Sequence, residues 1–172
     1  ETNVNASLDL PELLEEPPRF NQFSDGRFAV AWGGDDPQLA TIRSTGQIES
    51  THKLPASPTT IPIDFQAGTT LGLPGRLHLI PRTASSCDDY VLPVIDGKQE
   101  QWTAIVRVDE KHLLCLDSSH TLRRIEYRPE PIIHLALAGE LTFETPVTIA
   151  PTLTSNNHLV IIDQTNRLIT LD

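Results

Sequence analysis

Two matching segments 46 residues apart restrict the fold of this chain more than any other feature. The segment 111–125 (KHLLCLDSSHTLRRI) aligns without gaps to 157–171 (NHLVIIDQTNRLITL). The identical pairs are His112/His158, Leu113/Leu159, Asp117/Asp163 and Leu122/Leu168. A fixed period of this length is typical of four-stranded blades that stack on one another. Each segment is predicted to be a hairpin, with its aspartate bonding the backbone of the tight turn.

From residue 25 onward, short runs of β-branched and aliphatic residues alternate with polar ones, and turn residues separate the runs. The predicted strands are Arg27–Trp32, Gln38–Arg43, Gln47–Leu54, Thr60–Phe65, Arg76–Ile80, Tyr90–Ile95, Trp102–Val108, His112–Asp117, Thr121–Tyr127, Ile132–Ala138, Thr145–Ile149, His158–Asp163 and Arg167–Leu171. The 14 prolines suit loops and sheet edges, and they disfavour long helices. The pattern therefore predicts an all-β fold.

The repeat indicates a β-propeller, because a single blade has two faces to bury and needs neighbours. Weaker echoes of the repeat occur at Asp25–Trp32 and Pro74–Ile80. We predict three to four four-stranded antiparallel blades over residues 25–172, which is an incomplete ring. A β-sandwich is the alternative, but sandwiches do not require a fixed period.

Residues 1–24 are predicted to form a separate N-terminal segment. Asp9 is placed to cap a short helix with Pro11 in its first turn, and Pro17 and Pro18 follow as a proline-rich linker. This segment is interpreted as a linker or edge helix, with an acidic partner-binding arm as the alternative. Because the chain begins at Glu1 and lacks methionine, we expect it to be a piece of a longer protein.

The stretch from Ala40 to Gly46, followed by a strand, resembles the repeat of quinoprotein-like (PQQ-type) β-propellers. In that family each blade carries a pattern like A-x-D-x-x-T-G-x-x-x-W, whose tryptophan packs between blades. Ala40, Thr45 and Gly46 occupy their places in this pattern, whereas Ile42 and Ser50 replace the aspartate and the tryptophan. The hairpin at 158–172 resembles the same repeat.

The resemblance implies the propeller scaffold but not the redox enzyme. Quinone-dependent members of the family use a calcium ion, a stacking tryptophan and an adjacent cysteine pair. This chain has no such pair, and Trp32 and Trp102 lie outside the blade motif. Cys87 and Cys115 could form one disulfide, or could be a loop thiol and a buried thiol. The compartment stays open, although the family resemblance favours an extracytoplasmic or periplasmic location.

The charge of the chain disfavours several classes of partner. The formal net charge is −10, and a basic stripe for phosphates is absent from the sequence. We therefore expect no nucleic-acid partner and no binding to an anionic membrane. No apolar run reaches the roughly 20 residues that a membrane helix needs, so we expect no membrane insertion.

Motifs for catalysis or metal binding are weak throughout the sequence. The candidates were Ser118-Ser119-His120 as a nucleophile and base, His112 and His158 as channel ligands, the acidic turns Gly33–Pro37 and Ser86–Asp89 as calcium ligands, and Asn5–Ser7 as a glycosylation site. Each has a simpler interpretation as a turn, a strand start or a chance match. We therefore assign no catalytic, cofactor-binding or metal residue and expect no cofactor.

These observations favour a non-catalytic β-propeller module for protein–protein interaction or scaffolding, as a fragment of a larger protein. The expected partner is another protein, a missing part of the same chain, or a second copy that completes the ring. Two alternatives are a fragment of a quinoprotein-like oxidoreductase and a sensor domain of a receptor or kinase-linked protein.

Overall fold

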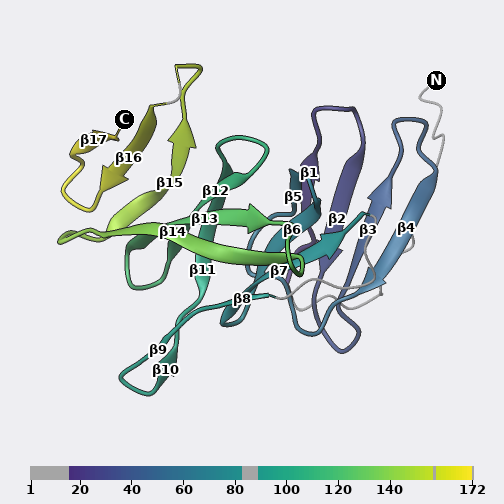
Figure 1. The fold of residues 1–172 in the computed structure, drawn as a ribbon, viewed down its shortest axis with the longest axis horizontal. Coiled ribbons are helices and arrows are strands. Elements are labelled where there is room, and N and C mark those ends of the chain that lie inside the picture. The colour runs from purple at the N-terminus through teal and green to yellow at the C-terminus, as the bar shows by residue number, and fades with distance from the viewer. Residues whose placement is uncertain (1–15, 83–88, 157, 172) are drawn as a thin grey trace.

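The computed structural model describes residues 16–82, 89–156 and 158–171, and these residues form 17 β-strands and no helix. The fold is all-β, as predicted. Three four-stranded sheets and one three-stranded sheet follow one another along the chain, and every strand pairs antiparallel with its neighbour in sequence. This simple order is that of propeller blades, and Figure 1 shows them in succession from the purple N-terminal end to the yellow C-terminal end.

The four blades are numbered along the chain. Blade 1 contains β1 (Arg19–Gln22), β2 (Phe28–Trp32), β3 (Gln38–Ile42) and β4 (Ile48–Lys53). Blade 2 contains β5 (Ile63–Phe65), β6 (Gly68–Leu73), β7 (Arg76–Pro81) and β8 (Tyr90–Val91). Blade 3 contains β11 (Trp102–Arg107), β12 (His112–Asp117), β13 (Thr121–Arg128) and β14 (His134–Thr142). Blade 4 contains β15 (Val147–Leu153), β16 (Leu159–Asp163) and β17 (Leu168–Leu171). A separate hairpin of β9 (Val94–Ile95) and β10 (Lys98–Gln99) lies between blades 2 and 3 in sequence.

The hydrophobic core lies between the blades, in three clusters. Ala29, Ala31 and Leu39 of blade 1 pack with Leu71 and Leu73 of blade 2. The second cluster joins blade 2 to blade 3, with Phe65, Leu77, Leu113 and Ile125 fully buried. The third joins Leu116 and Leu122 of blade 3 to Leu159 and Ile161 of blade 4. Each blade is therefore stabilised by its neighbours, as the repeat predicted.

Four hairpin turns share one geometry, with a single residue in the left-handed conformation. Gly26, Gly46, His120 and Asn166 have φ between 60° and 86°, and each donates its N–H to the carbonyl three residues earlier. This is a type I turn followed by a left-handed residue, a common three-residue hairpin loop. Glycine or asparagine suits that position because few other side chains adopt a positive φ without strain.

The strands differ from the prediction in several places, of which three change how the sheets are composed. The strand β1 lies within the segment that was expected to be a linker. The strand β6 was not predicted, so Arg76–Pro81 is the third strand of blade 2 and not the echo of a second strand. The predicted strand Tyr90–Ile95 is divided into β8 and β9, which belong to different sheets. The predicted helix at residues 8–16 lies almost wholly outside the described residues.

Within the described part of the chain, no helix is long and apolar enough to cross a membrane.

Candidate functional site

The two repeated aspartates form nearly identical buried networks at the turns of their hairpins. Asp117 Oδ1 accepts hydrogen bonds from the N–H of Ser119 at 3.1 Å and of Thr121 at 2.9 Å, and Asp117 Oδ2 accepts one from Arg123 Nε at 3.1 Å. Asp163 Oδ1 accepts from the N–H of Thr165 at 2.9 Å and of Arg167 at 3.0 Å, and its Oδ2 from Arg167 Nε at 3.0 Å. Both carboxylates are fully buried. Their interpretation as turn-forming residues agrees with this geometry.

The hydroxyls of Ser118 and Ser119 donate to carboxylates, those of Glu100 and Asp117 respectively. The Ser119 hydroxyl donates to Asp117 at 2.7 Å. The backbone of His120, with φ of 61°, takes the left-handed position of the turn. This arrangement fixes a hairpin turn.

The remaining candidate ligands lie apart from one another. His112 Nδ1 contacts Asp109 at 2.8 Å within its own turn, and the N–H of His158 donates to Thr154 at 3.2 Å. Asp36, in the turn 33–37, pairs with Lys53 at 2.7 Å, and Asp89 pairs with His78 at 2.7 Å. No group of three or more histidine, cysteine, aspartate or glutamate side chains is placed to hold a metal ion among the described residues.

Three of the motifs considered in the sequence lie outside the described residues in whole or in part. They are Asn5–Ser7, Cys87 and the first three residues of Ser86–Asp89. Cys115 is a free and fully buried thiol between blades 2 and 3, and burial raises its pKa. Its predicted burial is confirmed.

A polar hollow of about 550 Å³ lies between blades 1 and 2. Its lining includes Thr41, Ser50 and His52, with Ser50 Oγ placed 2.6 Å from Thr41 Oγ1 and 3.1 Å from His52 Nε2. Ser50 is a small residue of β4 in the lining of this hollow.

One carboxylate contacts arginines of three blades, and two of these arginines, Arg27 and Arg82, line the hollow. Asp64 of β5 pairs with Arg27 at 3.4 Å, with Arg82 and with Arg107 at 3.8 Å. Arg27 also pairs with Asp25 at 2.7 Å and with Glu49 at 3.5 Å. Arg43 also pairs with Glu49 at 3.4 Å, so four guanidinium groups and three carboxylates form one connected cluster. We interpret it as a clamp that joins blades 1, 2 and 3.

The outer face of blade 1 carries several exposed apolar residues. Ala29 and Ala31 point to blade 2, so the alternate residues of β2 point away from it. Register places further apolar residues on the same face. We call the apolar group Phe20, Phe28, Val30, Ile42 and Ile48 the outer face of blade 1. On the same side Trp32 and Ala40 are buried, and polar residues lie beside the group at Gln22, Gln38, Thr51 and Lys53. The exposed fractions of Phe20, Phe28 and Ile48 are 69%, 37% and 48%.

The outer face of blade 4 has the same character. Leu159 and Ile161 point to blade 3, so Val160 and Ile162 point away, and Ile149 and Leu168 are paired with Ile162 on that side. We call Ile149, Val160, Ile162 and Leu168 the outer face of blade 4. Leu168 is 62% exposed, whereas its repeat counterpart Leu122 is 5% exposed because blade 4 covers it. From the sequence we expected exposed blades, but the sequence did not identify the residues of the two outer faces.

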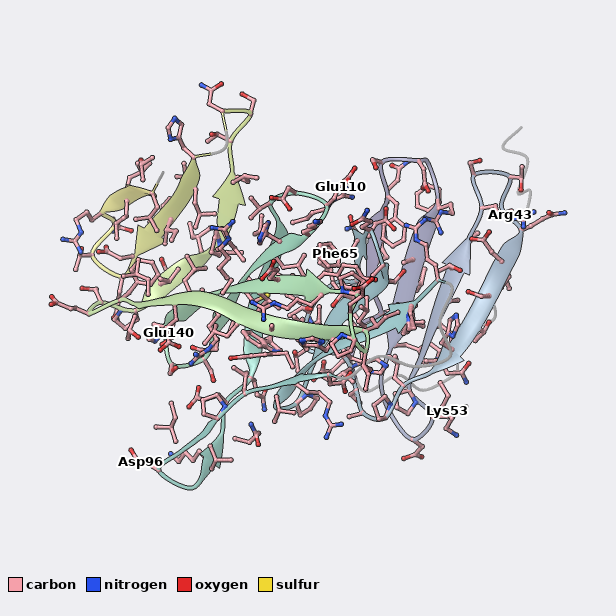
Figure 2. The ribbon with its side chains drawn as sticks, viewed as in Figure 1. Arg43, Lys53, Phe65, Asp96, Glu110 and Glu140 are labelled. Carbon is pink, nitrogen blue, oxygen red and sulfur yellow. The ribbon has the colours of Figure 1, made fainter. Side chains whose placement is uncertain are left out.

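The β9–β10 hairpin protrudes from the blades, and Figure 2 shows Asp96 at its tip far from Phe65 in the body. Asp96 and Gly97 have φ of 51° and 74°, which is a two-residue hairpin turn. Its base is fixed because the buried Leu92 donates its N–H to Gly75 at 2.8 Å. Val94 and Ile95 are exposed.

Comparison with known proteins shows the fold and no finer relationship. No family model matches the chain, and no curated protein matches it. Among solved structures, a putative 6-phosphogluconolactonase from Bacteroides uniformis is 14% identical with a TM-score of 0.64, and the match covers 90% of this chain and 55% of that one. BBS1N, in its complex with ARL6DN, is 16% identical with a TM-score of 0.60, over 90% of this chain and 49% of that one. BamB from Moraxella catarrhalis is 11% identical with a TM-score of 0.61, over 84% of this chain and 42% of that one.

The chain thus spans between two fifths and two thirds of the length of the solved structures that it resembles. All of these identities are low, so the similarity concerns the arrangement of strands. Together with the four sheets in chain order, it shows that the chain is composed of β-propeller blades.

Proposed function

We propose that the chain is a non-catalytic β-propeller module for protein–protein interaction, and that its outer blade faces are its binding surfaces. The observation that carries this proposal is the contrast between Leu122 and Leu168, which are 5% and 62% exposed. The same residue at the same place in the repeat is covered where a neighbouring blade follows. Leu168 is therefore an apolar residue of the type that packs between blades, but no neighbouring blade covers it among the described residues.

The opposite end of the chain supports the same interpretation. Phe20, Phe28 and Ile48 form an exposed apolar group on one sheet face. Groups of this kind mark interaction surfaces more often than isolated exposed residues do. BBS1N, a similar fold, was solved in complex with ARL6DN, so at least one protein of this architecture has a protein partner.

The same proposal includes two further points, which are that the blades are of the quinoprotein-like type and that a longer protein contains additional blades. Ala40 is fully buried in β3, and Gly46 has a φ of 86° in the following turn, as a quinoprotein-like blade would require. Because the chain spans only part of the propellers that it resembles, we propose that further blades of a longer protein cover one or both outer faces.

The experiment compares wild type with the variants Phe20→Lys/Leu168→Lys and Lys98→Glu/Asp96→Lys by sedimentation velocity and binding of an apolar fluorescent dye. Wild type should self-associate with rising concentration and bind dye, because both outer faces are uncovered. The Phe20→Lys/Leu168→Lys variant should remain monomeric with unchanged unfolding free energy, while the hairpin variant should behave as wild type. Wild type that is monomeric at every concentration and binds no more dye than the double variant contradicts the proposal.

A further inference from the structure

The interface between blades 1 and 2 changes from apolar to polar along its strands. Leu39 of β3 and Leu71 of β6 belong to its apolar cluster. Two residues later on β3 and two residues earlier on β6, the same faces carry Thr41 and Thr69. Between blades 2 and 3, by contrast, the third strand presents Leu79, which is buried in an apolar cluster. Blade packing alone therefore does not require polar residues here.

The fourth strand of blade 1 adds two polar side chains to this face. Register places Ser50 opposite Thr41 and His52 opposite Leu39, and residues directly opposite one another share a face. Thr41 Oγ1, Ser50 Oγ and His52 Nε2 form a hydrogen-bonded chain, with distances of 2.6 Å and 3.1 Å. Hydroxyls and a neutral imidazole can both donate and accept, so this chain can match either kind of group on a bound molecule.

Thr69 contributes a hydroxyl that is nearly buried and has no partner. The residue is 7% exposed and lines the polar hollow of about 550 Å³ between the two blades. Among the described residues the Thr69 hydroxyl makes no hydrogen bond, whereas that of the adjacent Thr70 donates to the carbonyl of His78 at 2.9 Å. A buried polar group without a partner is unfavourable. Thr69 therefore marks a point where a molecule in the hollow would gain a hydrogen bond.

The charged side chains of the lining are already paired with one another or with neighbours. Asp25 and Glu49 both contact Arg27, and Arg82 contacts a carboxylate of β5. The lining itself is balanced, with two guanidinium groups and two carboxylates, and Arg43 lies outside it. The hydroxyls and the imidazole that remain are uncharged at neutral pH. Such a lining suits a neutral ligand that both donates and accepts hydrogen bonds better than it suits an ion.

The rest of the lining is apolar and comes from both blades, namely Leu39, Ile80 and Pro81. A volume of about 550 Å³ lies within the usual range of small-molecule sites. A sugar ring offers the two surfaces that this hollow combines, since its hydroxyls form hydrogen bonds and its C–H groups pack on apolar side chains.

We propose that the polar hollow between blades 1 and 2 binds a neutral polyhydroxylated molecule of about one or two sugar rings. Its hydroxyls bond to Thr69 and to the chain of Thr41, Ser50 and His52, and its C–H groups pack on the apolar lining. This inference goes beyond the proposed function, because the hollow is separate from both outer blade faces and takes a small molecule.

The probes are methyl glucoside, methyl galactoside, methyl mannoside and maltose, with malonate and putrescine as an anion and a cation. Chemical-shift titration of the ¹⁵N-labelled protein measures binding. The protein carries Phe20→Lys/Leu168→Lys, so that self-association through the outer faces does not obscure the result. At least one of the four sugars should shift the amide signals of Thr41, Ser50 and Thr69 in a saturable manner. A dissociation constant on the order of 1 mM is expected for a ligand of this size.

Three variants of this protein locate the binding. Thr69→Val removes the unpaired hydroxyl at nearly constant shape, and Ser50→Ala interrupts the chain. Each should weaken sugar binding by about three- to tenfold, the effect of one hydrogen bond. Thr51→Val is the matched control, because Thr51 lies between Ser50 and His52 on β4 but is exposed on the opposite face. This control should bind as its parent does, and thermal unfolding verifies that each variant is folded.

Each other outcome overturns the inference at a defined point. Absence of binding by all four sugars overturns the ligand class, as does tighter binding of malonate or putrescine than of every sugar. Sugar binding that both Thr69→Val and Ser50→Ala leave unchanged overturns the location, and so does an equal loss in Thr51→Val. None of these results depends on whether the outer faces mediate association, because both faces are altered in every protein compared.

Discussion

At the residue scale, the two repeated aspartates hold equivalent turns in different surroundings. Asp117 and Asp163 each accept backbone and arginine donors, and both are fully buried. Their arginines differ, because the Arg123 side chain is 8% exposed and that of Arg167 is 65% exposed. Water can therefore solvate Arg167 when its partner is lost, but it reaches Arg123 poorly. The buried pair is the more sensitive to loss of charge.

This difference predicts the effect of neutralising each aspartate. Asp117→Asn should destabilise the protein by about 3 kcal/mol, because it leaves Arg123 buried without its full counter-charge. Asp163→Asn, at the exposed arginine, should cost clearly less. Urea unfolding followed by tryptophan fluorescence measures both, and equal losses would show that the arginine's burial is irrelevant.

The stabilisation that Asp163 provides should depend on pH, and the Asp163→Asn variant tests this. The Thr165 hydroxyl bond, followed by the backbone donors of Arg167 and Thr165, lowers the pKa of Asp163 below its ordinary value of 3.8. A lowered carboxyl pKa stabilises the folded state above the unfolded pKa, and this stabilisation is lost as pH falls through the folded pKa. The stability difference between wild type and Asp163→Asn should therefore be constant near neutral pH and shrink below pH 3.8. A difference that grows on acidification contradicts the lowered pKa.

At the scale of elements, β6 is the strand that most departs from its sequence pattern. It contains Gly68 and Gly72, precedes Pro74, and is buried on both faces. Glycines usually weaken a strand, but here they allow close packing. A Cβ at Gly72 would lie 2.8 Å from Trp102 Cβ, and one at Gly68 would lie 1.9 Å from the carbonyl oxygen of Ile80.

Alanine substitutions test whether β6 depends on these contacts. Gly72→Ala should cost about 1–3 kcal/mol, because the side chains of Thr60 and Trp102 must move. Gly68→Ala should cost more, since its close neighbour is backbone of β7. Gly139→Ala on β14 is the control, because nothing lies within 4 Å of its added Cβ, and the change should stay within about 0.5 kcal/mol. Chemical unfolding of the three variants ranks them, and a neutral Gly72→Ala refutes the packing explanation.

The hairpins that the sequence predicted well are those whose strands alternate clearly and whose turns carry a repeated aspartate, as in β12–β13 and β16–β17. The pattern failed at β6 because burial on both faces removes alternation, and at β1 because Arg19–Gln22 is short and follows two prolines. The contacts of Asp64 could not be predicted, since Arg27, Arg82 and Arg107 meet it only through the stacking of three blades. The outer faces follow from the register of paired strands, which one sequence does not specify.

At the scale of the whole molecule, stability resides in the interfaces between blades. The cluster between blades 2 and 3 is the largest of the three, and both of these blades have a neighbour on each side. Among the described residues, blades 1 and 4 each have one neighbouring blade, and β17 of blade 4 pairs only with β16. Repeat proteins with nearest-neighbour contacts unfold most readily at their ends.

Hydrogen exchange of backbone amides should therefore increase from the centre of the chain toward its ends. In the monomeric Phe20→Lys/Leu168→Lys variant, amides of β6 and β12 should exchange most slowly, because these strands are central in blades 2 and 3. The amides of residue 168, which is lysine in this variant, and of Thr170 should exchange fastest within the blades, because they point away from β16, the one strand with which β17 pairs among the described residues. Mass spectrometry of deuterated peptides measures the gradient. Uniform exchange would instead indicate that the four blades unfold as one unit, and slow exchange at β17 alone would mean that its edge is already covered.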